Sequence, residues 1–258
     1  MQELTVRVDG LTFSGTRGPF AIGKDGFDGW DDGVTWRVPE VERPNAHGYY
    51  DLPSYMNPRT ISITGYALAE SSRELRFMRS RLVGLLAGGS TGRIQVSRDG
   101  WTEWADCKVA TEGIAFDEVY GQNYANFMVQ LWCPNPLKYG DVNTFTVPSG
   151  ASYVTVFHRG NAVGYPSIVV SGSMPGGYVL QSTGGAEYRV TTPLTSGNPH
   201  TIDMATGLLV RGGLVVSGGV TRADLWRVQG GSTATNLRLQ PITTGTGTAT
   251  ATLLDTYT

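Results

Sequence analysis

The segment Gly88-Gly-Ser90-Thr-Gly92 matches the Gly-x-Ser-x-Gly pattern that presents the nucleophile of many serine hydrolases. That chemistry requires a strand before the serine and a helix after it, so that the hydroxyl stands on a sharp, exposed turn. Here the order is reversed, because a helical pattern ends at Gly88 and a strand-like alternation begins at Ile94. We therefore interpret the segment as a helix end followed by a loop.

A second group of candidate residues is acidic: Asp25, Asp28, Asp31 and Asp32 lie within eight positions. Calcium loops supply oxygens at alternate positions and add a distal glutamate, whereas these aspartates are mostly three apart. Asp-Gly pairs are also typical of tight turns. We expect turns here, with a calcium site as the alternative.

Histidines and cysteines are too sparse for a recognisable metal or nucleophile motif. His47, His158 and His200 are far apart, and no HExxH pair occurs. Cys107 and Cys133 have no neighbouring histidine that would activate a thiolate. We expect free, buried cysteines, with one disulfide left open, and neither a metal nor a cofactor.

Carboxylates and tryptophans complete the chemical candidates. Asp117 and Glu118 are adjacent, so in a strand they point to opposite faces and cannot act as a pair; a pair distant in sequence stays open. Trp101 and Trp104, with two earlier tryptophans, could form a sugar-stacking surface. In a strand-rich chain such residues are more often core, and we expect core.

The composition favours a folded, non-enzymatic protein. Charged residues are only 16% of the chain and the net charge is −2, which disfavours binding driven by neutralisation of phosphates. No apolar stretch is long enough to span a membrane, and the N-terminus lacks the pattern of a secretory signal. A weakly charged, strand-rich surface without a catalytic constellation indicates self-association or binding.

One helix is expected, from Ser71 to about Leu86. Ser71 and Glu74 form a capping box, and Gly88-Gly89 is expected to end the helix. Its apolar stripe comprises Leu75, Met78, Leu82 and Leu85.

The opposite face of this helix is a candidate contact surface. Phe77 lies there with the small residue Gly84, and Arg73 and Arg81 flank them. The alternative is a single exposed phenylalanine without a partner.

The rest of the chain is predicted to be strands in two domains. In the first part, apolar residues alternate with polar ones around Val6, Trp36, Ile61 and Val129. Of the 42 charged side chains, 31 precede residue 141, and prolines interrupt the chain near Pro136. We expect a boundary there, with domains 1–138 and 139–258. The second part has no helical period, and its tail from residue 243 to 252 is expected to be an edge strand or polar low-complexity chain.

Short strands separated by glycine-containing turns predict a β-sandwich for the second part. The expected strands are Val154–Phe157, Ile168–Val170, Tyr178–Leu180, Tyr188–Val190, Leu208–Val210, Leu214–Val216, Leu225–Val228 and Leu237–Leu239.

Several segments, in this order, resemble the distal tail proteins of long-tailed phages with flexible tails. The most recognisable is Phe127-Met-Val-Gln-Leu-Trp-Cys-Pro-Asn-Pro-Leu-Lys-Tyr139. The others are the Gly/Asp/Trp-rich stretch 20–36, His47-Gly-Tyr-Tyr50, Arg59-Thr-Ile-Ser-Ile-Thr-Gly65, the stretch 161–172, His200-Thr-Ile-Asp203 and Asp224-Leu-Trp226.

The resemblance implies a mainly β protein, with an N-terminal β-rich belt domain carrying one helix and a C-terminal galectin-like β-sandwich. It implies a homohexameric ring at the tail tip, between the tail tube protein and the tail-associated hub protein. The ring would anchor receptor-binding proteins, and the tape measure protein and DNA would pass through its lumen without specific binding. It also implies assembly in the host cytoplasm and a final place in the virion.

Three alternatives remain at this stage. A carbohydrate-binding or adhesin module would use the sandwich and the tryptophans. A tail tube subunit is also a β-rich ring former, but it would stack into long tubes. A glycan hydrolase would need a carboxylate pair that the sequence does not identify.

Overall fold

The computed structural model describes residues 4–15, 18–231 and 234–258, and it divides into two compact units. Unit 1 comprises residues 1–138 with Thr258, and unit 2 comprises residues 139–257. The described chain is mainly β with one α-helix, α1 (Ser72–Val83), so the expected fold class is confirmed. No helix among the described residues is long and apolar enough to cross a membrane.

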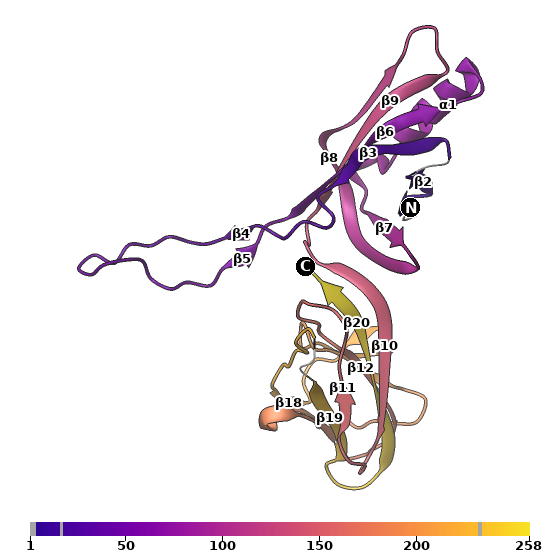
Figure 1. Ribbon diagram of the computed structural model, residues 1–258. Helices are drawn as coiled ribbons and strands as arrows, with labels where there is room; N and C mark the ends of the chain where they lie inside the picture. Colours follow the sequence, from indigo (N-terminus) through magenta and orange to yellow (C-terminus); the bar gives the residue numbers. More distant parts are fainter. Residues whose placement is uncertain (1–3, 16–17, 232–233) are drawn as a thin grey trace. The chain divides into compact units, whose positions relative to one another are not determined.

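Unit 1 is built around a closed barrel (Figure 1). Its strands pair in the order β7-β1-β2-β3-β6-β9, and β8 pairs with both β7 and β9. These strands are β1 (Leu4–Val8), β2 (Leu11–Ser14), β3 (Phe20–Asp28), β6 (Arg59–Leu68), β7 (Gly92–Arg98), β8 (Trp101–Glu118) and β9 (Tyr124–Cys133).

The length of β8 closes the barrel. Its first part, residues 101–107, pairs with β7, and its second part, residues 108–118, pairs with β9. The register shifts between Val109 and Ile114, and Glu112 there has a positive φ of 57°. Such a bulge bends a strand and increases its twist, which lets one strand serve two partners.

The barrel interior is filled by the apolar residues that alternate along the strands. Ile61, Ile63, Val129 and Leu131 are all fully buried, as the period of two predicts. Phe13, Phe20 and Phe127 form a cluster with ring centroids 5.6–5.7 Å apart. The helix α1 packs against β6 and β8, and the predicted stripe of Leu75, Met78, Leu82 and Leu85 is buried (Figure 1).

The ends of α1 differ in part from the prediction. The Ser71 hydroxyl caps the helix by accepting from the Glu74 N–H at 3.2 Å, but the Glu74 carboxylate accepts from Glu70 rather than from Ser71. The helix ends at Gly84, and Gly88 belongs to a separate 3-10 turn, η1 (Ala87–Gly89). The expected end at Gly88-Gly89 was therefore wrong, because Gly84 terminates the last turn first.

Unit 2 is a sandwich of two sheets around one core. One sheet has the order β17-β16-β15-β12-β20-β10 and the other β11-β19-β13-β14-β18. The strands are β10 (Lys138–Pro148), β11 (Val154–Val156), β12 (Ser167–Ser173), β13 (Tyr178–Ser182), β14 (Glu187–Val190), β15 (His200–Asp203), β16 (Leu209–Arg211), β17 (Leu214–Val215), β18 (Val220–Ala223), β19 (Thr235–Pro241) and β20 (Thr246–Tyr257). A 3-10 turn, η2 (Thr183–Gly185), follows β13.

Two expectations for the second part were wrong. The tail lies in β20 between β12 and β10, so it is a central strand, with Ala249 and Ala251 buried. The small Thr, Gly and Ala side chains of β20 fit inside the sheet sandwich, but their low hydrophobicity does not mark the segment as a buried strand in the sequence. The segment 225–228 is not a strand; Val228 makes only an isolated bridge with Gly164. The cysteines are free and buried.

Candidate assembly interface

A long extended hairpin projects from the barrel of unit 1 between β3 and β6 (Figure 1). We call residues 34–57 the arm. Its two short strands, β4 (Trp36–Arg37) and β5 (Tyr55–Met56), pair with each other, and a bridge joins Glu42 to Tyr49 nearer the tip. No residue of the arm is buried. The alternation around Trp36 therefore does not mark the half-buried strand that we expected.

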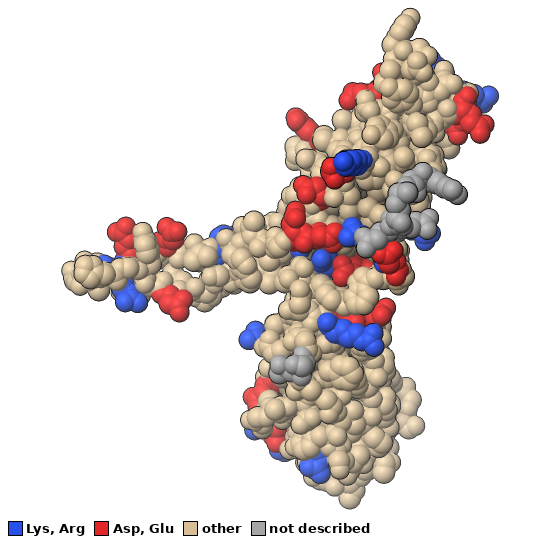
Figure 2. Space-filling model, viewed as in Figure 1, with Lys and Arg blue, Asp and Glu red and all other residues tan. Residues whose placement is uncertain are grey.

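The arm exposes an unusual amount of apolar surface for a segment outside a core. Its large exposed side chains are Trp36, Val38, Val41, Tyr49, Tyr50 and Tyr55, each 47–56% exposed. Two arginines lie over its rings, Arg37 over Tyr55 and Arg43 over Tyr50, at 5.9 and 5.7 Å from the ring centroids. Contiguous apolar surface of this kind indicates a contact site for another protein. Figure 2 shows acidic and basic side chains interspersed along the same arm.

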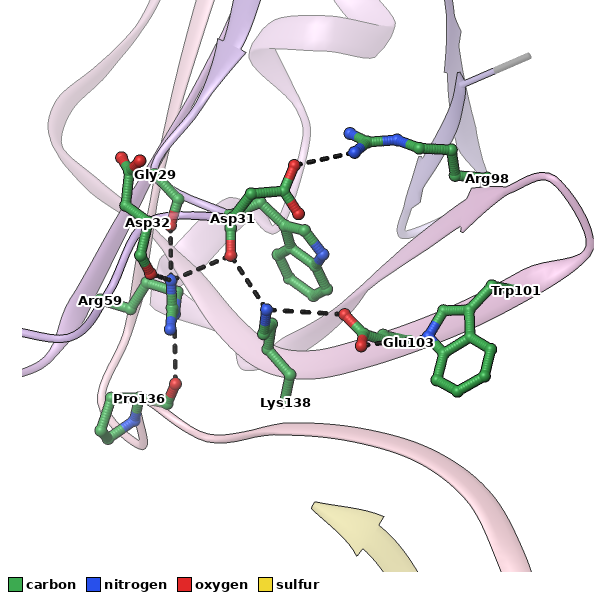
Figure 3. Close-up of polar contacts among 10 residues, drawn as sticks. Gly29, Asp31, Asp32, Arg59, Arg98, Trp101, Glu103, Pro136 and Lys138 are labelled. Atoms are coloured by element: carbon green, nitrogen blue, oxygen red, sulfur yellow. Dashed lines mark hydrogen bonds and ion pairs between the residues drawn. The ribbon is translucent and has the colours of Figure 1, made fainter. Parts of the chain in front are cut away.

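The loop from which the arm begins is held by a buried arginine. The Arg59 Nη1 donates to the carbonyl oxygens of Gly29, Trp30 and Asp32 at 2.8, 3.0 and 2.9 Å, and its Nε donates to Pro136 at 3.1 Å (Figure 3). Only 5% of Arg59 is exposed. Burial lowers the pKa of the guanidinium from its usual value, but a group that titrates so high remains charged. The charged side chain of Arg59 therefore holds four backbone carbonyl groups in place.

A lysine binds the same loop from the other side. The Lys138 Nζ donates to the Trp30 carbonyl at 3.1 Å and pairs with the Glu103 carboxylate at 3.6 Å. Burial lowers the pKa of Lys138, while Glu103 opposes the shift. Because Arg59 and Lys138 both donate to the Trp30 carbonyl, the loop is held between the first residue of β6 and the first residue of β10.

Glycine is required at one position of this clamp. Gly29 has a φ of +81°, and a Cβ there would collide with the Thr60 carbonyl oxygen. The Trp30 side chain is buried in the barrel core. We call residues 29–32, with Arg59 and Lys138, the root of the arm. Hydrogen bonds from Arg59 and Lys138 hold the root, whereas the backbone hydrogen bonds of residues 35–57 all lie within the arm.

The sequence-predicted contact residues lie on exposed parts of α1. Phe77 is 63% exposed, Arg73 is exposed, and Gly84 is the exposed C-cap. The Arg81 guanidinium lies 3.5 Å from the Gly10 carbonyl, at the limit of a hydrogen bond. The structure thus brings these residues to one helix surface, which stays a predicted contact site.

Trp101 and Trp104, which we expected in the core with a sugar-stacking surface as the alternative, are not buried, so the expectation of core was wrong for both. The Arg93 guanidinium lies 3.5 Å from the ring centroid of Trp104 and covers it. Trp101 is 46% exposed, and its Nε1 donates to Glu103 at 3.1 Å. No group of three or more His, Cys, Asp or Glu side chains within the described ranges could hold a metal ion.

Sequence reasoning missed the root. Nothing in the local pattern around Arg59 or Lys138 distinguishes a buried cation from a surface one. The signal that could have suggested it is an arginine immediately before the apolar alternation of β6, combined with the Asp-Gly-Trp turn that it must contact.

Comparison by structure identifies the class of fold. No protein-family model and no curated protein sequence matches the chain. The whole chain nevertheless shares its fold with a solved phage protein. It matches the crystal structure of the SPP1 Dit protein (gp 19.1), described as a paradigm of the hub adsorption apparatus in phages that infect Gram-positive bacteria. The TM-score is 0.74 at 16% identity, over 99% of both chains.

Two further solved structures agree. Chains of the phage p2 baseplate in its activated conformation, with Sr and with Ca, each match with a TM-score of 0.50 at 9% identity, over 97% of this chain and 98% of theirs. The resemblance to distal tail proteins drawn from the sequence is confirmed at the level of the fold.

Proposed function

We propose that the protein is a structural component of a phage tail tip, in which six copies close into a ring through unit 1. The full-length fold match to Dit and baseplate chains supports this role. The observation that carries the proposal is the arm, a clamped projection with exposed aromatic side chains that finds no partner surface within its own barrel. The role is structural rather than enzymatic.

Ring closure needs two different complementary surfaces on each copy, related by a fixed rotation. In Figure 1 the arm projects from one side of unit 1 and α1 lies toward the opposite end. The arm carries three acidic and two basic residues, and α1 carries four arginines and one glutamate. We propose that the arm of one copy packs on the surface of α1 around Phe77 in the next copy, because the charges are opposite and both surfaces are partly apolar.

In the virion, this ring would join the tail tube protein to the hub protein and anchor receptor-binding proteins. The tape measure protein and DNA would pass through its lumen. Assembly would take place in the host cytoplasm before the ring reaches its final place at the tail tip. The net charge of −2 is compatible with passage of DNA without binding.

The test is the oligomeric state of the purified protein by light scattering and negative-stain microscopy. We expect single or paired six-fold rings with a mass of six or twelve times 27.7 kDa. A variant in which residues 36–55 are replaced by a short Gly-Ser turn should be a folded monomer. Long stacked tubes would instead indicate a tail tube subunit, and a monomeric wild-type protein at high concentration would contradict the proposal.

The helix surface has its own test. Phe77→Asp should dissociate the ring while leaving the barrel folded, because Phe77 is exposed and contributes little to the core. Val142→Asp, at an equally exposed apolar position in unit 2, is the matched control and should leave the ring intact. A ring of unchanged mass in Phe77→Asp would exclude the helix surface as a contact site.

A further inference from the structure

A cavity of about 530 Å³ opens on unit 1 beside the root of the arm. It lies between the β7–β8 hairpin and the loop at residues 30–31, and Figure 3 shows most of the side chains that form it. Those that matter for the argument are Trp30, Asp31, Arg98, Trp101, Glu103 and Lys138. Concave sites with an apolar wall and a few converging polar groups are the usual form of small-molecule sites.

The polar groups at the base of this cavity are buried and fixed. The side chains of Lys138 and Glu103 are only 8% and 13% exposed and form an ion pair. Glu103 also accepts from the Trp101 Nε1, so the carboxylate orients the indole ring. The Lys138 ammonium donates to the Trp30 carbonyl and lies 3.6 Å from the Glu103 carboxylate as an ion pair. The base is therefore preorganised.

The rim of the cavity carries a second, more exposed ion pair. The Arg98 Nη1 donates to the Asp31 carboxylate at 2.9 Å. The two planar groups present donors and acceptors side by side, an arrangement that can bind two adjacent hydroxyl groups at once. Trp101, which is 46% exposed, supplies an aromatic surface near them.

Charge and shape together select the class of ligand. The lining carries three carboxylates, Asp31, Asp99 and Glu103, against two cations, Arg98 and Lys138, so an anionic ligand is disfavoured. A pyranose ring has an apolar face of C–H groups that suits an indole and an edge of hydroxyls that suits carboxylates and a guanidinium. We propose that this cavity binds a neutral hexopyranose unit of a polysaccharide, with its apolar face on Trp101 and its hydroxyls on Asp31 and Arg98.

The proposal distinguishes between the two neighbouring tryptophans. Trp101 is the expected platform because it is the more exposed of the two, whereas Trp104 is half-buried with Arg93 over its ring. The proposed sugar site does not depend on ring formation, since every residue that lines it belongs to one copy of unit 1. Binding and oligomeric state can therefore be measured separately.

The experiment titrates the full-length protein with the methyl glycosides of glucose, galactose and N-acetylglucosamine, and with their short oligomers. Binding is followed by saturation-transfer NMR and by calorimetry. We expect saturable binding of at least one of them with a Kd of roughly 1 mM or below. Trp101→Ala should weaken that binding about tenfold or more, and Tyr120→Ala, at a fully exposed aromatic residue of unit 1 away from the cavity, should leave it unchanged.

A second variant tests the same site in case Trp101→Ala does not fold. Asp31→Asn keeps the shape of an exposed side chain while removing the carboxylate, so it should also weaken binding without changing the thermal unfolding midpoint. Absence of saturable binding by every sugar tested would overturn the proposal. So would binding that survives both variants, or binding of phosphocholine in preference to all the sugars.

Discussion

The barrel of unit 1 and the arm that leaves it belong to one unit, yet their stability has different sources. The barrel buries its aromatic and aliphatic residues and holds two cations at its edge, so its structure is determined within one copy. The arm buries no residue and pairs only with itself along two short strands. The exposed apolar residues of the arm are therefore held in place by the root and not by a core of their own. The predictions below separate the two regions by effect on the free energy of unfolding, from the largest to the smallest.

The first variant removes the cation of the root. Arg59→Ala leaves the carbonyls of Gly29, Trp30, Asp32 and Pro136 without their donor in a buried site. We expect the free energy of unfolding to fall by about 3–5 kcal/mol, measured by urea denaturation. Arg37→Ala, on the arm, is the control and should change it by less than about 0.5 kcal/mol. Equal losses for the two variants would mean that the buried hydrogen bonds of Arg59 contribute no more to stability than an exposed arginine of the arm.

The second prediction concerns pH and the buried thiols of the barrel. Burial raises the pKa of Cys107 to about 12 and that of Cys133 to about 11, from a usual value of 9.0. Between pH 9 and the raised pKa of each thiol, the unfolded chain loses the thiol proton that the folded chain keeps. The free energy of unfolding should therefore fall as the pH rises above 9, by up to about 1.4 kcal/mol per pH unit for each thiol.

The reference for this measurement is the double variant Cys107→Ala with Cys133→Ala. Its free energy of unfolding should fall less steeply between pH 9 and 11, because other groups still titrate but the thiols are gone. Parallel curves for the two proteins would show that the thiols are not protected by the fold.

The third prediction tests the start of α1. Ser71→Ala removes the acceptor of the Glu74 N–H and should lower the free energy of unfolding by about 1 kcal/mol in thermal or urea denaturation. Ser80→Ala is the matched control, since the Ser80 hydroxyl donates to the Arg76 carbonyl within the helix and does not cap it. That change should be neutral or slightly stabilising, because alanine favours helix interiors.

The smallest effect on unfolding is expected in the arm. Trp36→Ala should change the free energy of unfolding of the monomer by less than about 0.5 kcal/mol, because the side chain is 53% exposed. The same variant should shift ring dissociation to protein concentrations at least about tenfold higher, measured by light scattering on dilution. A stability loss without any change in assembly would reverse the interpretation of the arm.

Local patterns predicted much of the barrel and little of the root. The period of two located β1, β6 and β9, and the cap at Ser71 with the stripe from Leu75 located α1. These features depend on neighbours a few positions away, which a sequence displays directly. The same alternation around Trp36 was misleading, since a period of two indicates an extended chain but not what covers it.

The sequence alone determined that this protein is mainly β with one helix and that it resembles the distal tail proteins, because alternation, capping and the order of motifs can be read along the chain. Only the tertiary structure decided that β8 closes the barrel and that β20 is central. It also brought Arg59 and Lys138, 79 positions apart, to a single carbonyl of Trp30. The physical reason is that a hydrogen bond to a buried carbonyl depends on which distant residues the fold places beside it, and no local propensity encodes that distance.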